Sequence, residues 1–409
     1  MTAHEVDVVV VGLGPGGESV ATQLGQAGLE VVGVDRRLVG GECPYYGCIP
    51  SKMMIRAADV LAEGRRIPDF AGGSTVTSDW SPVHARIRDE ATTDWDDQVA
   101  VDRLVKAGVT FVRGAARLTG PRTVDVDGTT YTARRGVVLN TGTEPSAPPI
   151  GGLADTPFWT NRDAVRLAEL PGSLIVIGGG AIGAEMTQAF ARFGVHVTLL
   201  EVADRILAPE EPESSALVAA GRRPNLADLG LDTVGLDPHA RAVEIDEHMR
   251  AAEGLWVIGD ITGKGAFTHM SMYQAAIAVR DILGQDGPGA SYHAVPHVTF
   301  TDPEIGGVGM SEQQARDAGL TVRTGITELE RSSRGFTHGP GGHGLIKVVE
   351  DADRGVLVGA TAVGPAGGEI LGCLAVAVHA EVPVDTLRTM IYAYPTFHRA
   401  IESALADLS

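Results

Sequence analysis

Two of the three cysteines in this sequence lie close together, in the stretch GGECPYYGCIPSK at positions 40–52. Four residues separate Cys43 from Cys48, and Lys52 follows four positions after the second cysteine. A pair at this spacing has three chemical uses: a redox dithiol, a structural disulfide, or two ligands of a metal ion. A zinc site needs two further ligands, and the sequence contains no second cluster of this kind. The pair is therefore redox-active or structural, and its surroundings decide which.

The composition limits the classes of function open to the chain. Its 409 residues suffice for two or three domains, and its net charge of −19 opposes binding to nucleic-acid phosphates. No apolar run reaches the length of a membrane span, and the N-terminus lacks the features of a signal peptide. We therefore expect a cytoplasmic protein with no nucleic-acid or membrane partner. A structural disulfide has little use in that reducing compartment, which favours a redox role for the cysteines.

Residues 6–35 have the pattern of a strand, a glycine-rich turn, a helix and a second strand. Gly12, Gly14 and Gly17 form G-x-G-x-x-G, and Asp35 ends the second strand. In such a motif the first glycine makes the turn, the second lets the backbone approach a pyrophosphate, and the third packs the helix on the strand. The helix N-terminus then faces the phosphate charge. The segment predicts a dinucleotide-binding fold.

Residues 172–201 repeat this pattern, with Gly178, Gly180 and Gly183 in the turn and Glu201 at the end of the second strand. Two such folds predict two dinucleotides, one resident and one visiting. An acidic residue at this strand end accepts a hydrogen bond from a ribose 2′-hydroxyl and repels a 2′-phosphate, so NADH is favoured over NADPH. Arg205 lies close by in the sequence and weakens that preference.

The rest of the chain supplies further strands. One apolar run ends in Thr141–Gly142 and another in Gly259–Asp260, where a carboxylate at the C-terminal edge of a parallel sheet holds a ligand hydroxyl. From about residue 292 the pattern changes to strand-like segments with one helical segment. We predict an α/β protein with two Rossmann-like dinucleotide-binding domains, the second truncated, followed by a C-terminal α+β domain.

The order of these motifs resembles the class I pyridine nucleotide–disulfide oxidoreductases, a family that includes dihydrolipoamide dehydrogenase, glutathione reductase and mercuric reductase. The resemblance covers nearly the whole chain and rests on the two glycine turns and on GGECPYYGCIPSK, TGTEP, GRRPN, VIGD, FTDPE and YPTFHR. It implies FAD in the first fold, NADH or NADPH in the second, and a homodimer formed by the C-terminal domain. On this basis the FAD-binding domain spans residues 1–150 and 223–290, the truncated NAD(P)-binding domain 151–222 and the dimerisation domain 291–409.

The same resemblance assigns roles to individual residues. It implies that Cys48 is the thiol beside the flavin, that Cys43 is the thiol that attacks the substrate, and that Lys52 pairs with Glu185 near the flavin and the nicotinamide. The residues implied to bind FAD are Gly12, Gly14, Gly17, Asp35, Gly41, Lys52, Gly114, Thr141, Gly142, Asp260 and His269. Those implied to bind the nicotinamide nucleotide are Gly178, Gly180, Gly183 and Glu201. No metal site is expected.

The C-terminal motif departs from the family pattern. Dihydrolipoamide dehydrogenases have His-Pro-Thr-x-x-Glu there, with the His as acid–base and the Glu orienting it, whereas this chain has Tyr394 and Arg399 at those positions. A tyrosine with an ordinary pKa of about 10 donates a proton but is a poor base at neutral pH. His398 can serve as the base only if the turn is rearranged; otherwise it starts a helix near the dimer interface, within reach of Glu402. The motif argues against efficient reduction of a small disulfide.

The second nucleotide-binding fold is also unusually short. A strand–helix–strand unit takes about 30 residues, and residues 172–221 leave little sequence for the remaining strands of such a domain. The stretch SSALVAAGRRPN at 214–225 has the character of a seam, left either by loss of most of the domain or by omission of a segment from this sequence, and we favour omission or excision. If the segment is absent from the molecule, NADH binding is weakened or lost.

We predict an FAD-dependent NAD(P)H:disulfide oxidoreductase that passes electrons through Cys43 and Cys48 to an acceptor. Three alternatives stay open. The first is an NAD(P)H:quinone or dye reductase, for which the missing base costs little. The second is a thiol oxidase that takes a dithiol and oxygen, and the third is a flavin-binding protein without turnover. The sequence does not define the acceptor beyond a small-molecule disulfide, dithiol or quinone.

Overall fold

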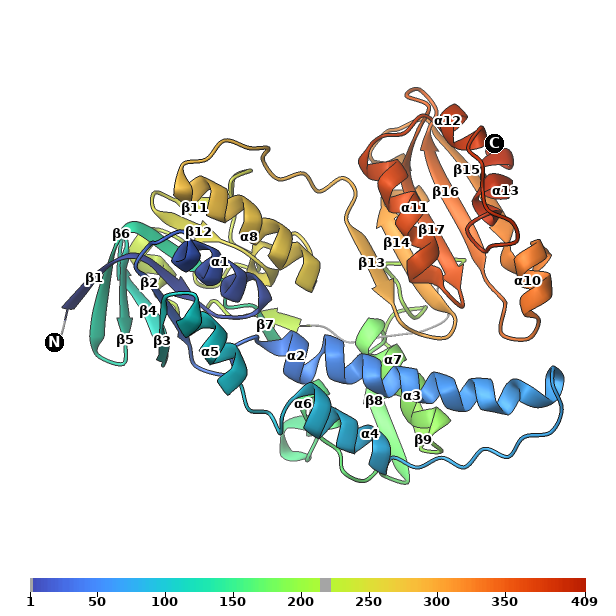
Figure 1. The fold of residues 1–409 in the computed structure, drawn as a ribbon, viewed down its shortest axis with the longest axis horizontal. Coiled ribbons are helices and arrows are strands. Elements are labelled where there is room, and N and C mark those ends of the chain that lie inside the picture. The colour runs from blue at the N-terminus through green and yellow to red at the C-terminus, as the bar shows by residue number, and fades with distance from the viewer. Residues whose placement is uncertain (1–2, 214–221) are drawn as a thin grey trace. The chain divides into compact units, whose positions relative to one another are not determined.

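The computed structural model describes residues 3–213 and 222–409 of the chain, which form two compact units. The described residues of the first unit are 3–51, 84–167 and 222–291, and those of the second are 52–83, 168–213 and 292–409. Each unit is therefore assembled from three separate stretches of sequence. Figure 1 shows their elements along the chain. The three-domain boundaries expected from the sequence stay a prediction.

The first unit is built on a mixed sheet with a parallel core. The order of its strands is β11 Arg250–Ala252, β12 Leu255–Val257, β6 Thr129–Leu139, β1 Ala3–Val11, β2 Val31–Asp35 and β3 Val109–Arg113. All neighbours from β12 to β3 pair in parallel, whereas β11 is antiparallel to β12. Two more strands extend the sheet: β5 Thr123–Val126 pairs antiparallel with β6, and β4 Ala116–Gly120 pairs antiparallel with β5. The strands expected before Gly12, Asp35, Thr141 and Gly259 are all present.

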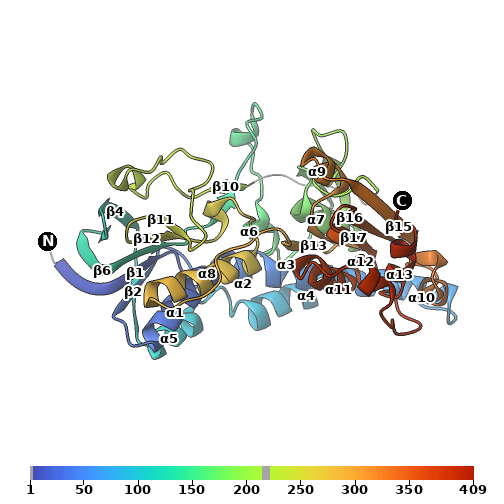
Figure 2. The same ribbon diagram turned by 90° about the horizontal axis from the view of Figure 1, so that it is seen from above.

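The two faces of this sheet are covered differently, because successive residues of a strand point to opposite faces. Val8 and Val10 of β1 pack against helices α1 Pro15–Gln26, α5 Gln98–Lys106 and α8 Thr268–Leu283. Val9 and Val11 pack on the other side, among residues of β4 and β5. Figures 1 and 2 show α1, α5 and α8 together on one face of the sheet. This is the layered arrangement of a dinucleotide-binding fold.

Two short helices and a long one are relevant to the cysteine pair. The helices are α2 Glu42–Tyr46, α3 Cys48–Arg66 and α6 Asn161–Ala164. Gly47 separates α2 from α3 with a non-helical backbone (φ −130°, ψ −112°), so α3 starts at Cys48. A small antiparallel pair, β7 Thr143–Pro145 with β10 Arg222–Pro224, lies beyond the end of β6.

The second unit contains a five-stranded antiparallel sheet. Its order is β13 Pro296–Thr299, β14 Glu304–Gly309, β17 Val356–Gly364, β16 Leu345–Asp351 and β15 Val322–Glu328. Helices α11 Gly367–His379, α12 Val384–Arg388 and α13 Ala400–Ala406 bury their apolar residues against it. Shorter helices are α4 Ser81–Ala85, which begins in this unit, α9 Glu312–Asp317 and α10 Ser333–His338. The predicted α+β domain is confirmed.

The same unit holds the second glycine-turn fold, which is short. It consists of β8 Ser173–Ile177, α7 Ala181–Arg192 and β9 His196–Leu200, and β8 and β9 form a parallel pair with no third strand among the described residues. The predicted fold class, with a truncated second Rossmann-like fold, is confirmed. The junction at 214–221, where the sequence suggests a seam, lies outside the described residues.

A buried lysine joins the segment after β9 to the antiparallel sheet. Lys347 of β16 has a side chain that is 4% exposed, and its Nζ contacts Glu211 at 3.0 Å, Glu213 at 2.8 Å and Glu312 at 2.9 Å. Burial acts to lower the pKa of Lys347, but its hydrogen bonds to the three carboxylates raise it well above the usual range. Glu211 also accepts the backbone N–H of Glu312 at 2.6 Å. The cluster fixes residues 211–213 on the sheet.

We predict that Lys347→Met lowers the free energy of unfolding by about 3–5 kcal/mol at pH 7, because it leaves the buried Glu211 carboxylate without its cation. Lys347 and Arg316 hold the pKa of Glu312 below its usual range, so the stability from Glu312 is present above its unfolded pKa and is lost as pH falls through its folded pKa. The difference between variant and wild type should therefore shrink as pH falls below about 4. Denaturant unfolding at pH 7 and pH 3.5 measures both effects. The exposed Arg316→Ala serves as a control expected to change stability by about 0.5 kcal/mol or less.

Candidate active site

The first glycine turn leaves backbone groups open at the N-terminus of α1. Gly12 has φ +88°, and a Cβ added to it would press on the carbonyl of Asn140. Gly14 is the N-cap of α1, and a Cβ on Gly17 would overlap the Gly12 carbonyl oxygen. Gly41 has φ +68° and packs so closely that its Cβ would lie 3.0 Å from Gly14 Cα. A turn without side chains at a helix N-terminus fits the pyrophosphate of a dinucleotide.

The Asp35 carboxylate is hydrogen-bonded to the backbone of this glycine turn. Its carboxylate accepts the backbone N–H of Leu13 and of Arg37, each at 2.7 Å. Burial raises the pKa of Asp35 despite these two hydrogen bonds. Gly114 lies beside it, since its N–H donates to the Asp35 carbonyl at 3.1 Å. A carboxylate has lone pairs for more than two donors, so its predicted contact with the ribose is compatible with this geometry.

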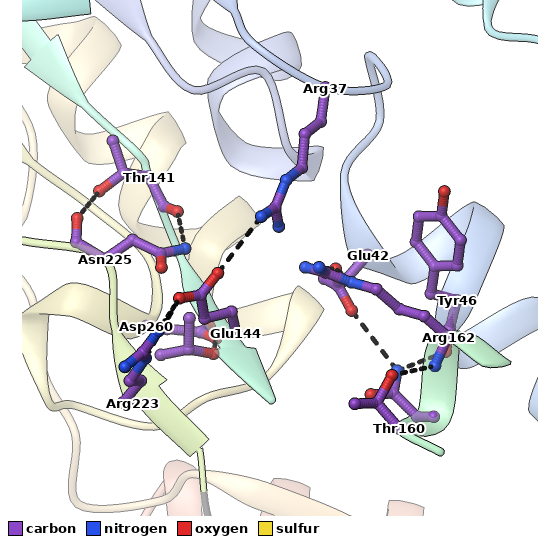
Figure 3. A network of polar contacts seen from close by, with 12 residues as sticks. Arg37, Glu42, Tyr46, Thr141, Glu144, Thr160, Arg162, Arg223, Asn225 and Asp260 are labelled. Carbon is purple, nitrogen blue, oxygen red and sulfur yellow. Dashed lines mark hydrogen bonds and ion pairs between the residues drawn. The ribbon is translucent and has the colours of Figure 1, made fainter. Parts of the chain in front are cut away.

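Thr141, Gly142 and Asp260 lie at the carboxyl ends of β6 and β12, held by a partner that the sequence did not reveal. Asn225 donates its Nδ2 to the Thr141 carbonyl and accepts from Thr141 Oγ1 at its own carbonyl, both at 2.9 Å. The Asn225 N–H also donates to the Gly142 carbonyl. Thr143 Oγ1 donates to Asp260 Oδ2 at 2.5 Å. Figure 3 shows this cluster with Glu144 between Arg37 and Arg223, to which it is ion-paired.

Cys48 lies beside the N-termini of two helices. It is the first residue of α3, and its Sγ is 3.3 Å from the Oγ1 of Thr268, the first residue of α8. The N-terminus of a helix carries partial positive charge and unsatisfied N–H groups, both of which stabilise a thiolate. Cys43 lies in α2, and both cysteines are half-buried. His269 follows Thr268 in α8, and its ring stacks on Phe267 at 5.1 Å between centroids.

Lys52 and Glu185 form the predicted ion pair. Lys52 Nζ lies 2.7 Å from Glu185 Oε2, and the Glu185 side chain is only 3% exposed. The other carboxylate oxygen of Glu185 accepts the backbone N–H of Phe300 at 2.9 Å, and the Phe300 ring lies 4.7 Å from Lys52 Nζ. Phe300 is thus a third member of this group that the sequence did not indicate. Lys52 is on α3, one helical turn after Cys48.

The second glycine turn has the geometry of the first. Gly178 has φ +102° and donates to the Leu200 carbonyl, while Gly180 caps the N-terminus of α7. Gly183 is buried in the first turn of that helix. Glu201 accepts the N–H groups of Val202 and Ala203, and these backbone hydrogen bonds lower its pKa. The Arg205 guanidinium donates to the carbonyls of Ala208 and Glu210.

Among the described residues of the C-terminal motif, no histidine pairs with a glutamate. Tyr394 is 69% exposed, and the Arg399 guanidinium lies over its ring at 5.6 Å. Glu402 pairs with Arg399 at 3.0 Å, so it does not take the role beside His398 that its spacing allowed. His398 is half-buried and its ring faces Tyr392 at 6.2 Å. Tyr394 and His398 therefore remain predicted catalytic residues. Among the described residues of the motif, no acid orients either of them as a base.

The short helix α2 is tethered to residues 160–166, far from it in sequence. Arg162 Nε donates to Glu42 Oε1 at 2.7 Å, and Asn161 Nδ2 donates to the Tyr46 carbonyl at 2.8 Å. Arg166 donates to the Tyr46 hydroxyl at 3.0 Å. Figure 3 shows Arg162 reaching toward Glu42 beside Tyr46. The contacted residues, Glu42 and Tyr46, lie on either side of Cys43 in the sequence. No local sequence pattern predicted these contacts.

Two absences apply to the described ranges 3–213 and 222–409. They contain no group of three or more His, Cys, Asp or Glu side chains that could hold a metal ion. No helix within them has the length and apolar character needed to cross a bilayer.

Comparisons with known proteins agree with this geometry. Residues 6–217 match the family model described as pyridine nucleotide-disulphide oxidoreductase, and residues 295–405 match the dimerisation domain of that family. The dihydrolipoyl dehydrogenase of Halobacterium salinarum is 32% identical over 462 aligned positions, covering 97% of this chain and 95% of that protein. The mercuric reductase of Bacillus cereus is 26% identical, covering 98% of this chain and 71% of that protein. The Escherichia coli HOCl-induced flavoprotein disulfide reductase RclA is 24% identical and shares the fold (TM-score 0.83), covering 98% of this chain and 99% of that chain.

We predict that Thr268→Val weakens the thiolate of Cys48, because the valine removes a hydroxyl that can donate to the sulfur. The midpoint at which the Cys48 thiolate forms should rise by about one pH unit, the effect of losing one charge-assisted hydrogen bond. Thiolate absorbance near 240 nm in the reduced protein, followed against pH, measures the midpoint. Thr156→Val, which removes an exposed hydroxyl that donates to the Gly152 carbonyl, should leave the midpoint in place. An unchanged midpoint in Thr268→Val would show that the hydroxyl does not support the thiolate.

Proposed function

Because the chain belongs to the pyridine nucleotide-disulphide oxidoreductases, an FAD- and NAD(P)H-dependent family, we propose that Cys43 and Cys48 are the dithiol through which its electrons reach an acceptor. The observation that carries this proposal is the position of Cys48 Sγ beside Thr268, at the N-termini of α3 and α8. Such a position favours the thiolate, which is the reactive form of cysteine. Bound FAD supplies the step that takes two electrons as hydride from the nicotinamide and passes them to a disulfide.

The groups that hold FAD are proposed from the backbone cradle. The glycine turn at Gly12, Gly14 and Gly17 faces the pyrophosphate, and Asp35 lies where the adenosine ribose is held in such folds. Asp260 and the Thr141–Gly142 turn lie at the carboxyl edge of the sheet, where the rest of the cofactor is bound in open α/β sheets. The turn at Gly178 and Glu201 is proposed for NAD(P)H. The described β8–α7–β9 unit would supply contacts to the pyrophosphate and ribose of that nucleotide and little more.

The chemistry of the dithiol follows from its two sulfurs. The Cys43 thiolate attacks one sulfur of an acceptor disulfide, which forms a mixed disulfide and releases the other sulfur as a thiolate that takes up a proton. The Cys48 thiolate then attacks the Cys43 sulfur, which closes the Cys43–Cys48 disulfide and releases the second acceptor sulfur as a thiolate that also takes up a proton. Two electrons leave the dithiol and reduce one disulfide to two thiols. Lys52, held by Glu185, places one positive charge a turn after Cys48 on α3.

The C-terminal motif, among the described residues, supplies no histidine–glutamate pair to protonate the released thiolate. Tyr394 stands at the position of the family histidine, and its phenol hydroxyl can donate a hydrogen bond to the leaving sulfur. This observation favours acceptors whose leaving thiol is acidic, and it keeps quinone reduction as the second candidate function, since a quinone needs no thiol leaving group. We further propose a homodimer through residues 295–405 and a cytoplasmic location, where NAD(P)H and reduced thiols are maintained.

We predict that Cys43→Ser lowers NADH-dependent reduction of a small disulfide by at least about 100-fold, because the attacking sulfur is gone. Quinone reduction should fall by less than about threefold if electrons reach quinones from the flavin directly. Steady-state NADH oxidation with each acceptor measures the two rates. Cys373→Ser, at the third cysteine in α11, is the matched control and should retain both activities. Disulfide reduction that survives in Cys43→Ser would refute the assignment of Cys43.

We predict that Glu201→Ala lowers the preference for NADH over NADPH about tenfold, because the carboxylate that accepts from the ribose hydroxyl and repels a 2′-phosphate is lost. The ratio of kcat/KM for the two nucleotides measures the preference. Asp204→Ala, at an exposed acid three residues further along, removes the same charge and should leave the ratio nearly unchanged. A ratio that shifts equally in both variants would place the discrimination elsewhere.

A further inference from the structure

The residue before Cys43 is an acid, Glu42, and the structure pairs it with one arginine. The Glu42 side chain is 27% exposed and that of Arg162 is 23% exposed, so the pair is largely shielded from water. Arg162 Nε donates to Glu42 Oε1 at 2.7 Å, and Arg162 Nη2 lies 2.5 Å from the same oxygen. Asn161 Nδ2 approaches the other oxygen at 3.4 Å. Both carboxylate oxygens of Glu42 therefore face α6.

The backbone of α2 leaves Cys43 little freedom relative to this pair. The buried Tyr45 accepts at its carbonyl the indole N–H of Trp95 at 3.0 Å. Tyr46 is held by Asn161 at its carbonyl and by Arg166 at its hydroxyl. The Arg166 guanidinium in turn lies between the rings of Tyr46 (5.1 Å) and Trp95 (4.7 Å). Every residue of α2 that flanks Cys43, apart from Pro44, is thus fixed by a specific polar contact.

Other charged groups on the segments around α2 have partners of their own. On α1 and α5, Glu18 pairs with Arg103, and beside them Asp97 pairs with Arg113 and accepts the Val39 N–H. Asp96 accepts the N–H of Gln98, and Asp163 closes the cap of α6 with Thr160. Arg166 bonds to the Tyr46 hydroxyl.

We propose that Arg162 is a positioning residue for the dithiol: it neutralises Glu42 and fixes the start of α2, so that Cys43 reacts as a thiolate at neutral pH. An unpaired carboxylate on the adjacent residue disfavours a second negative charge on the sulfur, whereas a paired one does so far less. Arg162 acts on Cys43 through Glu42 and needs no direct contact with the sulfur. The inference rests on the proposed role of Cys43 as the thiol that attacks the acceptor.

The test is the pH dependence of Cys43 alkylation in the reduced holoenzyme. Iodoacetamide is added at a series of pH values, and tandem mass spectrometry assigns the modified cysteine. In Arg162→Gln the midpoint should rise by about half to one pH unit, which slows alkylation at pH 7 about three- to tenfold. In Glu42→Gln the midpoint should stay equal or fall, and in the double variant Arg162→Gln/Glu42→Gln it should return to the wild-type value. This rescue separates the charge effect from a merely structural loss.

Three controls complete the experiment. Arg162→Lys keeps the charge and should keep the wild-type midpoint. Asn161→Ala removes a neighbouring tether of α2 without changing charge and should not move the midpoint. Arg122→Gln breaks an exposed arginine–glutamate pair elsewhere in the same unit and should also leave it unchanged.

Two results would overturn the inference: a profile of Arg162→Gln that coincides with wild type, or a double variant that stays shifted like the single one. Either result leaves the function of the dithiol intact if Cys43→Ser still abolishes disulfide reduction. Conversely, full disulfide reduction by Cys43→Ser removes the proposed function even if the alkylation profile shifts. Glu42→Gln keeps the arginine and gives a reading even if Arg162→Gln folds poorly.

Discussion

The site depends on the point at which α3 begins. The non-helical backbone of Gly47 separates α2 from α3, so Cys48 is the first residue of a 19-residue helix. The N-terminal charge of a long helix stabilises a thiolate there, and one turn further Lys52 meets the buried carboxylate of Glu185. A start one residue earlier or later would turn both side chains by about 100° around the helix axis. The proposed redox thiol and the lysine therefore share one geometric constraint, the residue at which α3 begins.

The second glycine-turn fold has only two paired strands among the described residues, and polar contacts along α7 stabilise it. Along α7, Gln188 exchanges hydrogen bonds with the backbone of Asp302, and Arg192 pairs with the carboxylates of Asp59 and Asp302. Hydrogen bonds from Arg66 and Arg192 keep the pKa of Asp302 below its usual range although burial acts to raise it. Phe190 is buried against Trp80. The alignment with the H. salinarum relative spans 462 positions, more than the 409 residues of this chain, so part of that relative has no counterpart here.

The sequence predicted what repeats at short range. Local periodicity predicts the C-terminal α+β domain and the strands that end near Asp35 and Glu201. The two turns are predicted by their glycines, which the backbone conformation of such a turn requires. The pairing of Lys52 with Glu185 came from the family resemblance, since 133 positions separate them. Asn225 and Arg162 were missed because their partners lie 84 and 120 positions away, and hydrogen bonds of that kind leave no periodic signal. The use of Asp35 to brace its own glycine turn was also missed.

The central claim is that NADH reduces a flavin that shares electrons with the thiolate of Cys48. The most direct measurement is the absorption spectrum of the purified holoenzyme while NADH is added stepwise under anaerobic conditions. The account predicts a long-wavelength thiolate-to-flavin band that grows with NADH and is absent in Cys48→Ser. A flavin that stays oxidised with NADH but develops the band with dithionite would contradict the reductase account, because the dithiol would be competent while the shortened nucleotide fold was not.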